Sequence, residues 1–408
     1  MSNSNVLPLP HIFRKNLGIL TLHSGLNEGA ILQALALSRH LARSIPGSQV
    51  EIIDFRYSQK ITAYGPLINQ RHIALFNFAS RALPLSKNRM IQPDRTGLYQ
   101  KIEQEYNLLI LGSDEIWKLK YEKGWLGLTK QCSPWHPAFP NAYWPEKISI
   151  PVIAYAPSIG RTDITTIPRR HRIQMEKCMR HFTLLSYRDE KTLQFLEWLS
   201  PAIAQKAVFV PDPVFTLPLD QIQSFQENVK FRLMEKGINF DRPLLGIILD
   251  PSEETNNALR FFRKKGYQII AFSYPNVQCD LDLSSEAFNP LEWMGLFQCM
   301  DICLSCRFHG CISCLMGNVP FIGIDQYNSK SKNTKIRSLL KTFDLEKNYF
   351  NEYLREGKSL KQICEALLEQ PWPTDSISKK IDQLRNLSNV FAEKILNIIT
   401  PEYETVRK

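Results

Sequence analysis

Short apolar runs alternate with longer amphipathic segments along the first half of the chain. Most runs reach Gly, Ser or Asp near their ends, and all have the length and apolar character of strands buried in a parallel sheet. Helical segments lie between several of them, for example at 30–44 and 166–182. This β-α-β order predicts a doubly wound α/β fold. The six runs are LGILTLHSG (17–25), VEIIDF (50–55), LLILGSD (108–114), PVIAYAPSIG (151–160), FTLLSYRD (182–189) and AVFVPDPVF (207–215).

The same pattern restarts near residue 242. Because 408 residues exceed what one hydrophobic core usually organises, we predict two Rossmann-like domains, 1–241 and 242–408. The segment from 374 onward carries apolar residues at three-to-four spacing, which predicts a closing amphipathic helix. The strands expected in the second domain are LLGIILD (244–250), YQIIAFSYP (267–275), MDICLS (300–305) and VPFIGID (319–325).

Composition narrows the class of protein only slightly. With 44% hydrophobic and 22% charged residues, the chain has the balance of an ordinary globular protein. The formal net charge of +10 favours anionic ligands, but the charge is spread along the chain, and no motif for nucleic-acid recognition accompanies it. We find no signal peptide and no apolar stretch of about eighteen residues. We therefore expect a cytoplasmic protein without a transmembrane segment and without a nucleic-acid partner.

Five of the nine cysteines crowd residues 299–314, where CLSC and CISC flank RFHG. Paired C-x-x-C units are common ligands of zinc and iron–sulfur clusters. However, alternation along a strand sends Cys303 and Cys306 to opposite faces, and zinc sites usually have a longer loop between their pairs. We therefore expect no metal, and we interpret these cysteines as small buried residues with free thiols.

Polar residues gather where the predicted strands end. Ligands of open parallel sheets bind beyond the carboxyl ends of the strands, so these segments should meet at one site. Taken singly they have ordinary explanations: Arg188 could be a surface ion-pair partner, and Asp212 could form a turn. A structural role explains SCRFHG less well, because this segment places two cationic side chains, Arg307 and His309, between two apolar elements. The segments are HSGLNEGA, GSDEIW, APSIG, SYRDE, PDP and SCRFHG.

In the order and spacing of these motifs, the sequence resembles the polysaccharide pyruvyl transferase family from about residue 17 to about residue 345. The resemblance depends on TLHSGLNEGAILQALAL, LLILGSDEIWKL, IAYAPSIG, SYRDEKT, VPDPVF and SCRFHG. Glu28 stands where the family commonly has an aromatic residue, and Glu115 where it has Gln. The resemblance implies a glycosyltransferase-B-like pair of domains facing across a cleft. It also implies transfer of pyruvate from phosphoenolpyruvate to two sugar hydroxyls as a cyclic ketal, with no cofactor and no metal.

The resemblance also implies roles for particular residues. Phosphoenolpyruvate carries a carboxylate and a phosphate, which guanidinium groups and helix N-termini bind well. An imidazolium held near phosphate can supply the proton that the vinyl carbon needs. The candidate catalytic residues are His309 as acid, Arg307, and Asp114 as base. The candidate donor-binding residues are Arg188, Arg307, Gly310 and Lys330, with Lys332 and Lys335 as alternatives to Lys330. The candidate acceptor-binding residues are Asn27, Gly29, Gln33, Ser113, Asp114 and Trp117.

Two other functions remain open from the sequence. A nucleotide-sugar glycosyltransferase would use the same architecture and would bind its nucleotide in the second domain. A non-catalytic binding protein would have no need of a proton donor beside two anion-binding arginines, so Arg188, Arg307 and His309 together disfavour it. The expected partners are phosphoenolpyruvate and a saccharide acceptor. A lipid-linked acceptor would bring the protein to a membrane surface.

Overall fold

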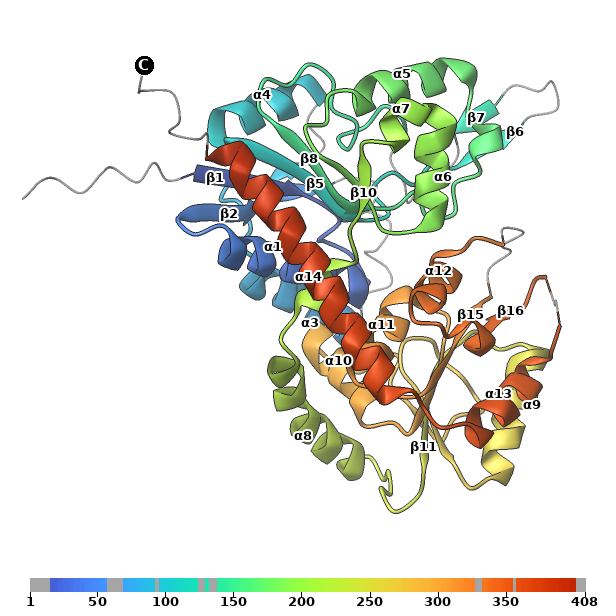
Figure 1. Ribbon diagram of the computed structural model, residues 1–408. Helices are drawn as coiled ribbons and strands as arrows, with labels where there is room; N and C mark the ends of the chain where they lie inside the picture. The colour runs from blue at the N-terminus through green and yellow to red at the C-terminus, as the bar shows by residue number, and fades with distance from the viewer. Residues whose placement is uncertain are drawn as a thin grey trace, which may run out of the picture.

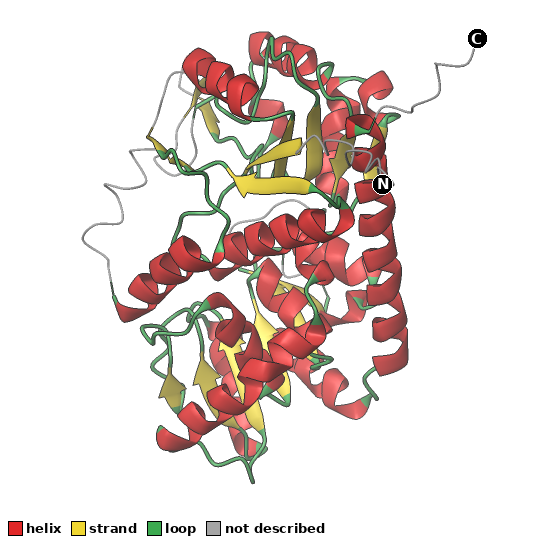
Figure 2. Ribbon diagram, turned by 90° about the vertical axis from the view of Figure 1, so that its left-hand side faces the viewer, coloured by secondary structure: helices red, strands yellow, loops and turns green. Residues whose placement is uncertain are grey.

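The protein has two units, each built on a parallel β-sheet between layers of helices. In this computed structural model the units lie one above the other, and helix α14 runs along both (Figure 1). Figure 2, turned by 90°, shows helices on either side of the strands in each unit. The residues described are 15–56, 69–91, 95–123, 129–131, 138–326, 332–354 and 357–400.

The first unit contains a four-stranded parallel sheet in the order β2-β1-β5-β8. The parallel pair β9–β10 continues it, joined to β8 through a bridge between Ile153 and Leu184. The strands are β1 (Lys15–Leu20), β2 (Ser48–Ile52), β3 (Phe55–Arg56), β4 (Met90–Ile91), β5 (Leu108–Asp114), β6 (Tyr121–Lys123), β7 (Thr129–Gln131), β8 (Val152–Pro157), β9 (Leu185–Tyr187) and β10 (Ala207–Phe209). The helices are α1 (Glu28–Ser44), α3 (Gln70–Ala82), α4 (Arg95–Glu105), α5 (Arg169–Met179), α6 (Glu190–Leu199), α7 (Pro201–Ala204), the short helices η2 (Ile164–Thr166) and η3 (Pro213–Thr216), and α8 (Leu219–Glu235).

The second unit contains a six-stranded parallel sheet in the order β13-β12-β11-β14-β15-β16. Its central strands are entirely buried and apolar, as a sheet covered on both faces requires. The strands are β11 (Leu244–Ile248), β12 (Gln268–Ala271), β13 (Leu281–Asp282), β14 (Ile302–Ser305), β15 (Phe321–Asp325) and β16 (Tyr349–Asn351). The helices are α9 (Glu253–Lys264), α10 (Pro290–Gln298), α11 (Phe308–Met316), α12 (Lys335–Thr342), η4 (Glu346–Asn348), α13 (Leu360–Glu369) and α14 (Thr374–Ile399).

The predicted α/β class is confirmed, and each of the ten predicted strand segments contains a strand. The amphipathic segment from 374 forms α14. The strands that the pattern did not predict are two or three residues long, such as β13 and β16, and runs this short carry no clear period.

Two helices cross the predicted boundary at residue 242. α8 precedes it but packs against α10 of the second unit, whereas α14 follows it but packs against α1 and η3 of the first. The ring nitrogen Nε2 of His40 in α1 donates to the carbonyl of Ser388 in α14 (3.2 Å). At the other end of α14, Asn318 Nδ2 donates to Thr374 Oγ1 (3.0 Å). The chain therefore ties the two units together twice.

The cysteine-rich segment lies inside the second unit. Cys303 on β14 and Cys311 and Cys314 on α11 are buried free thiols, and burial raises the pKa of Cys311. Within the described ranges, no group of three or more His, Cys, Asp and Glu side chains is placed to hold a metal ion. None of the helices in the described residues is long and apolar enough to cross a membrane.

Candidate active site

A cleft of about 460 Å³ lies between the two units. Asp114 at the carboxyl end of β5 and Asn27 at the start of α1 line it from the first unit. Arg307 and His309, which follow β14, line it from the second. The cleft thus occupies the position where open parallel sheets bind ligands.

The turn between β14 and α11 presents a helix N-terminus at this cleft. Ser305 Oγ accepts from the backbone N–H of Arg307 (3.2 Å) and donates to its carbonyl (3.1 Å), which fixes the turn. Arg307 is the N-cap residue of α11, in an extended conformation, and its side chain makes no capping hydrogen bond. The first backbone N–H groups of α11 therefore have no side-chain cap beside the cleft, and such groups favour an anion.

A row of buried titratable side chains connects the two units beneath the cleft. The guanidinium of Arg188 has no exposed side-chain surface; it donates through Nη1 to Asp212 Oδ2 and through Nη2 to Asp114 Oδ1 (3.4 Å). Nε2 of His309 lies 3.5 Å from the same Oδ2 of Asp212. The row therefore runs Asp114–Arg188–Asp212–His309.

The charges in this row stabilise one another against the effect of burial. Burial alone raises the pKa of Asp212, but the nearby His309 and Arg188 outweigh it and lower the pKa to about 2. Burial likewise acts to lower the pKa of Arg188, but Asp212 and Asp114 raise it overall. Arg188 and Asp212 are therefore both charged at neutral pH, although neither contacts solvent to a significant extent.

Gly29 provides the space for the imidazole of His309. A Cβ at residue 29 would lie 2.0 Å from Nδ1 and 2.5 Å from Cγ of this ring. Gly29 is the second residue of α1, and its N–H donates to the side chain of the N-cap residue Asn27 (3.0 Å). Gly29 was predicted to bind the acceptor but does not line the cleft; its lack of a side chain allows the close approach of α1 to the imidazole.

A second ion-pair group closes one side of the cleft. Glu115 accepts from Lys118 of the same unit (2.7 Å) and from Lys335 at the start of α12 (2.7 Å). Burial raises the pKa of Glu115, but the two lysines outweigh it and hold the pKa well below its ordinary value. Glu28, the other acidic departure from the family pattern, accepts from Arg71 (2.6 Å). Glu28 and Glu115, the two acidic residues that differ from the family pattern, thus each belong to a buried ion pair.

Several predicted site residues do not line the cleft. Arg188 is fully buried, is paired with two carboxylates and does not line the cleft, so its donor-binding role stays a prediction. Gly310 faces the inside of its own turn, because a Cβ there would lie 2.4 Å from Ser305 Oγ. Its small size serves packing rather than close approach to a ligand.

Three predicted acceptor residues lie in the interior behind the cleft. Ser113 and Gln33 are fully buried and are bonded to each other, with Ser113 Oγ donating to Gln33 Oε1 (2.6 Å). Trp117 is also fully buried, packs against Trp144 with ring centroids 5.8 Å apart, and donates to the carbonyl of Tyr143 (3.3 Å). Gln33, Ser113 and Trp117 have no exposed surface and do not line the cleft, so their acceptor contacts stay predictions that this structure does not support.

The predicted donor lysine, Lys330, lies outside the described residues. Of the two alternatives, Lys335 lines the cleft and Lys332 does not. The ammonium of Lys335 also lies 5.5 Å from the ring centroid of Phe308.

Sequence reasoning missed four charged residues of the site. Lys118 and Glu115 lie within the quoted GSDEIWKL, and Arg161, which lines the cleft, directly follows the quoted APSIG. Asp212 lies in the strand-end segment PDP, but the sequence left a simple turn as an equal explanation and gave it no role in the site. All four residues lie in or next to motifs that the sequence analysis identified. The sequence does not indicate which side chains of a motif point toward the cleft.

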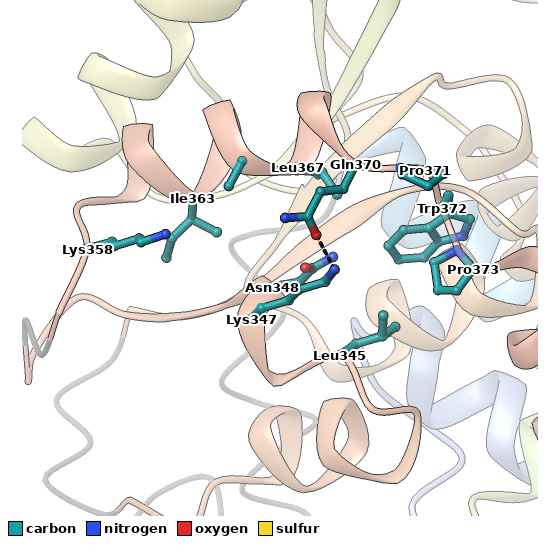
Figure 3. Close-up of a pocket in the computed structure, with 11 residues that line it drawn as sticks. Leu345, Lys347, Asn348, Lys358, Ile363, Leu367, Gln370, Pro371, Trp372 and Pro373 are labelled. Carbon is teal, nitrogen blue, oxygen red and sulfur yellow. Dashed lines mark hydrogen bonds between the residues drawn. The ribbon is translucent and has the colours of Figure 1, made fainter.

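A smaller cavity of about 80 Å³ lies elsewhere in the second unit, beside α13 (Figure 3). Leu345, Ile363 and Trp372 form much of its wall, and Lys347 donates to Gln370 at its rim. It shares no residue with the cleft. The larger cleft, which contains the motif residues, is therefore the candidate active site.

Comparison with known proteins gives one family and one fold. The sequence model described as polysaccharide pyruvyl transferase matches residues 27–328, about three quarters of the chain. A comparison with curated proteins finds no match.

Solved structures resemble this one over almost its whole length. UDP-GlcNAc 2-epimerase from Neisseria meningitidis bound to UDP-GlcNAc has a TM-score of 0.53 at 10% identity, covering 94% of this chain and 100% of that one. The UDP-GlcNAc 2-epimerase from Methanocaldococcus jannaschii gives 0.52 at 13% identity, with coverage of 95% and 100%. The N-terminal domain of Candida albicans trehalose-6-phosphate phosphatase gives 0.52 at 12%, with coverage of 95% and 97%. At these identities the likeness concerns the fold alone, and it confirms two Rossmann-like domains of the glycosyltransferase-B kind.

Proposed function

We propose, since the chain belongs to the polysaccharide pyruvyl transferase family, that it transfers pyruvate from phosphoenolpyruvate to two hydroxyls of a saccharide. A proton adds to the vinyl carbon, and one hydroxyl oxygen bonds to the neighbouring carbon. The second hydroxyl oxygen then replaces phosphate at that carbon and closes the ketal. The two hydroxyl protons account for the third methyl hydrogen and for the proton on the released phosphate.

The basic side of the cleft supports phosphoenolpyruvate as the donor. Arg307, Arg161, Lys118 and Lys335 line it, together with the N-terminus of α11. Glu115 balances one of the two lysine charges, so the group formed by Glu115 and its two lysines keeps a net positive charge. A small ligand with a carboxylate and a phosphate matches this arrangement of donors.

His309 is the residue that we assign as the general acid. Its imidazole lies at the N-terminus of α11, next to Arg307, in the lining of the same cleft. Proton transfer from a positioned imidazolium to the vinyl carbon needs no other cofactor. This placement of His309 is the observation on which the mechanism depends.

We place the acceptor on the side of the first unit. Asn27 and Asp114 remain in the lining there after Gln33, Ser113 and Trp117 are set aside. Asp114 adopts a φ of 71°, a conformation that Asp tolerates better than most residues, and its side chain is about one tenth exposed. We assign it as the base that accepts a hydroxyl proton, with Arg188 holding the carboxylate in place.

The test of this proposal separates the donor from a nucleotide sugar. A ligand that binds the folded state raises the melting temperature, so phosphoenolpyruvate should stabilise the protein and UDP-sugars should not. Phosphate release is then measured with phosphoenolpyruvate and a panel of free and lipid-linked glycans. Stabilisation by UDP-sugars alone, with no phosphate release from any acceptor, would favour a glycosyltransferase instead. The cytoplasmic location stays a prediction from the sequence.

Lys335 should contribute to donor binding, and Lys332 should not. Replacing Lys335 with methionine removes one charged hydrogen-bond donor from the cleft, so the KM for phosphoenolpyruvate should rise by about ten-fold to 100-fold. Lys332→Met is the matched control, because the same change three residues away lies outside the cleft lining. Equal KM values for the two variants would remove Lys335 from the donor site.

A further inference from the structure

We propose that Asp212 is the positioning residue for His309, holding the proton on Nε2 so that Nδ1 is the nitrogen that exchanges a proton with the cleft. The inference rests on the proposed function for its catalytic consequence, but not for the geometry. Neither the family match nor the motif analysis assigns a role to this aspartate.

The carboxylate of Asp212 is fixed on several sides. Its side chain is 1% exposed. Oδ1 accepts from the backbone N–H of Val214 at the start of η3 (3.0 Å), and Oδ2 accepts from Arg188. The carboxylate therefore cannot turn away from the imidazole without breaking both contacts.

The imidazole of His309 has two distinct nitrogens in this environment. Nε2 is buried and, among the described residues, has no hydrogen-bond partner; the nearest carboxylate oxygen is Oδ2 of Asp212, 3.5 Å away. That separation is longer than an ordinary hydrogen bond, so the proposed contact has to shorten as the cleft tightens around a ligand. Nδ1, the other ring nitrogen, packs against Gly29 at the start of α1.

The pairing explains which proton moves. With Asp212 keeping the proton on Nε2, the imidazolium gives its Nδ1 proton to the vinyl carbon and becomes neutral without losing the Nε2–H. A proton from an acceptor hydroxyl later restores Nδ1–H. A carboxylate that selects one tautomer of a catalytic histidine in this way controls turnover rather than binding. The other charged residues that line the same cleft are Glu28, Asp114, Glu115, Lys118, Arg161, Arg307 and Lys335.

The contact also crosses between the units. Asp212 follows β10 of the first unit, whereas His309 belongs to α11 of the second. The tautomer of the imidazole is therefore set only when the two units are in this arrangement. His309 would therefore carry its proton on Nε2 only while Asp212 of the first unit lies against it.

The proposal is tested by determining which ring nitrogen of His309 carries the proton, a measurement that does not depend on enzymatic turnover. ¹⁵N-histidine spectra of the full chain, with the signal assigned by its loss in His309→Gln, should show Nε2–H in the wild type. In Asp212→Asn the amide can donate to Nε2, so the population should shift toward Nδ1–H. An unchanged tautomer in Asp212→Asn would overturn the proposal, even if the variant were less stable.

Turnover supplies the second readout. In Asp212→Asn the kcat for phosphate release should fall by about 10²-fold while the KM for phosphoenolpyruvate stays near the wild-type value, and Asp212→Glu should recover part of the loss. Asp189→Asn is the matched control: this carboxylate is also buried beside Arg188, but it caps α6 and does not contact His309. It should lower stability without changing the tautomer. If Asp212→Asn does not fold, the wild-type spectrum decides: a proton on Nδ1 in place of Nε2 would overturn the proposal.

The two proposals fail separately. A wild-type protein with the expected tautomer and no release of phosphate from phosphoenolpyruvate would contradict the proposed function and leave the Asp212–His309 pairing intact. Phosphate release with equal kcat in wild type and Asp212→Asn would contradict the pairing and leave the function intact.

Discussion

Replacing His309 with glutamine lowers the kcat for phosphate release from phosphoenolpyruvate by about 10²-fold to 10⁴-fold, the usual contribution of a general acid. The dissociation constant of phosphoenolpyruvate should change little, because Arg307, Lys335 and the N-terminus of α11 remain. The measurement is single-turnover phosphate release at saturating donor, with binding followed by calorimetry.

The control for this prediction is His181→Gln. His181 is exposed and lies outside the cleft lining, so the same change there should leave kcat unaltered. Wild-type turnover in His309→Gln would remove the imidazole from the mechanism. A large rise in the dissociation constant with unchanged kcat would make His309 a binding residue instead.

Replacing Gly29 with alanine should reduce kcat almost as strongly, although alanine carries no charge and is a better helix former than glycine. The added Cβ would lie 2.0 Å from Nδ1 and 2.9 Å from Cβ of His309, so the ring cannot avoid it by moving its far end alone. A displacement of about 1 Å at a reacting group costs about 10²-fold in rate. The measurement is kcat together with the melting temperature, which should stay high enough for folding at assay temperature.

The double variant Gly29→Ala/His309→Gln distinguishes a local effect from a general one. If the methyl group acts through the imidazole, the two losses should not add, because the second substitution removes the group that the first displaces. Gly295→Ala serves as the control, because a Cβ there meets nothing closer than 3.6 Å. Additive losses would show that Gly29→Ala acts elsewhere.

The sequence predicts the sheets well because buried parallel strands are continuous apolar runs. LLILGSD predicts β5 and MDICLS predicts β14, and both strands are buried along their whole length. The order of strands within each sheet does not follow from these runs. The exchange of α8 and α14 between the units was not predicted either, because amphipathic helices show an apolar stripe but not the surface that covers it.

The candidate site was predicted in part, because motif order placed Arg307, His309 and Asp114 at strand ends that meet. What the pattern lacks is the direction of each side chain. Ser113 is adjacent to Asp114, yet it points inward to Gln33, while Asp114 reaches the cleft. Burial of Arg188 could not be predicted either, because the sequence does not show that Asp114 and Asp212 both pair with this guanidinium.

Helix α14 has a mechanical consequence for how a long glycan could reach the cleft. Its first turn is bonded to the second unit at Asn318, and Ser388 further along is bonded to the first at His40. Because α14 is one continuous helix attached to both units, it limits how far the two units can move apart. Any widening of the cleft that keeps both attachments must break other contacts between the units, such as the Lys335–Glu115 ion pair.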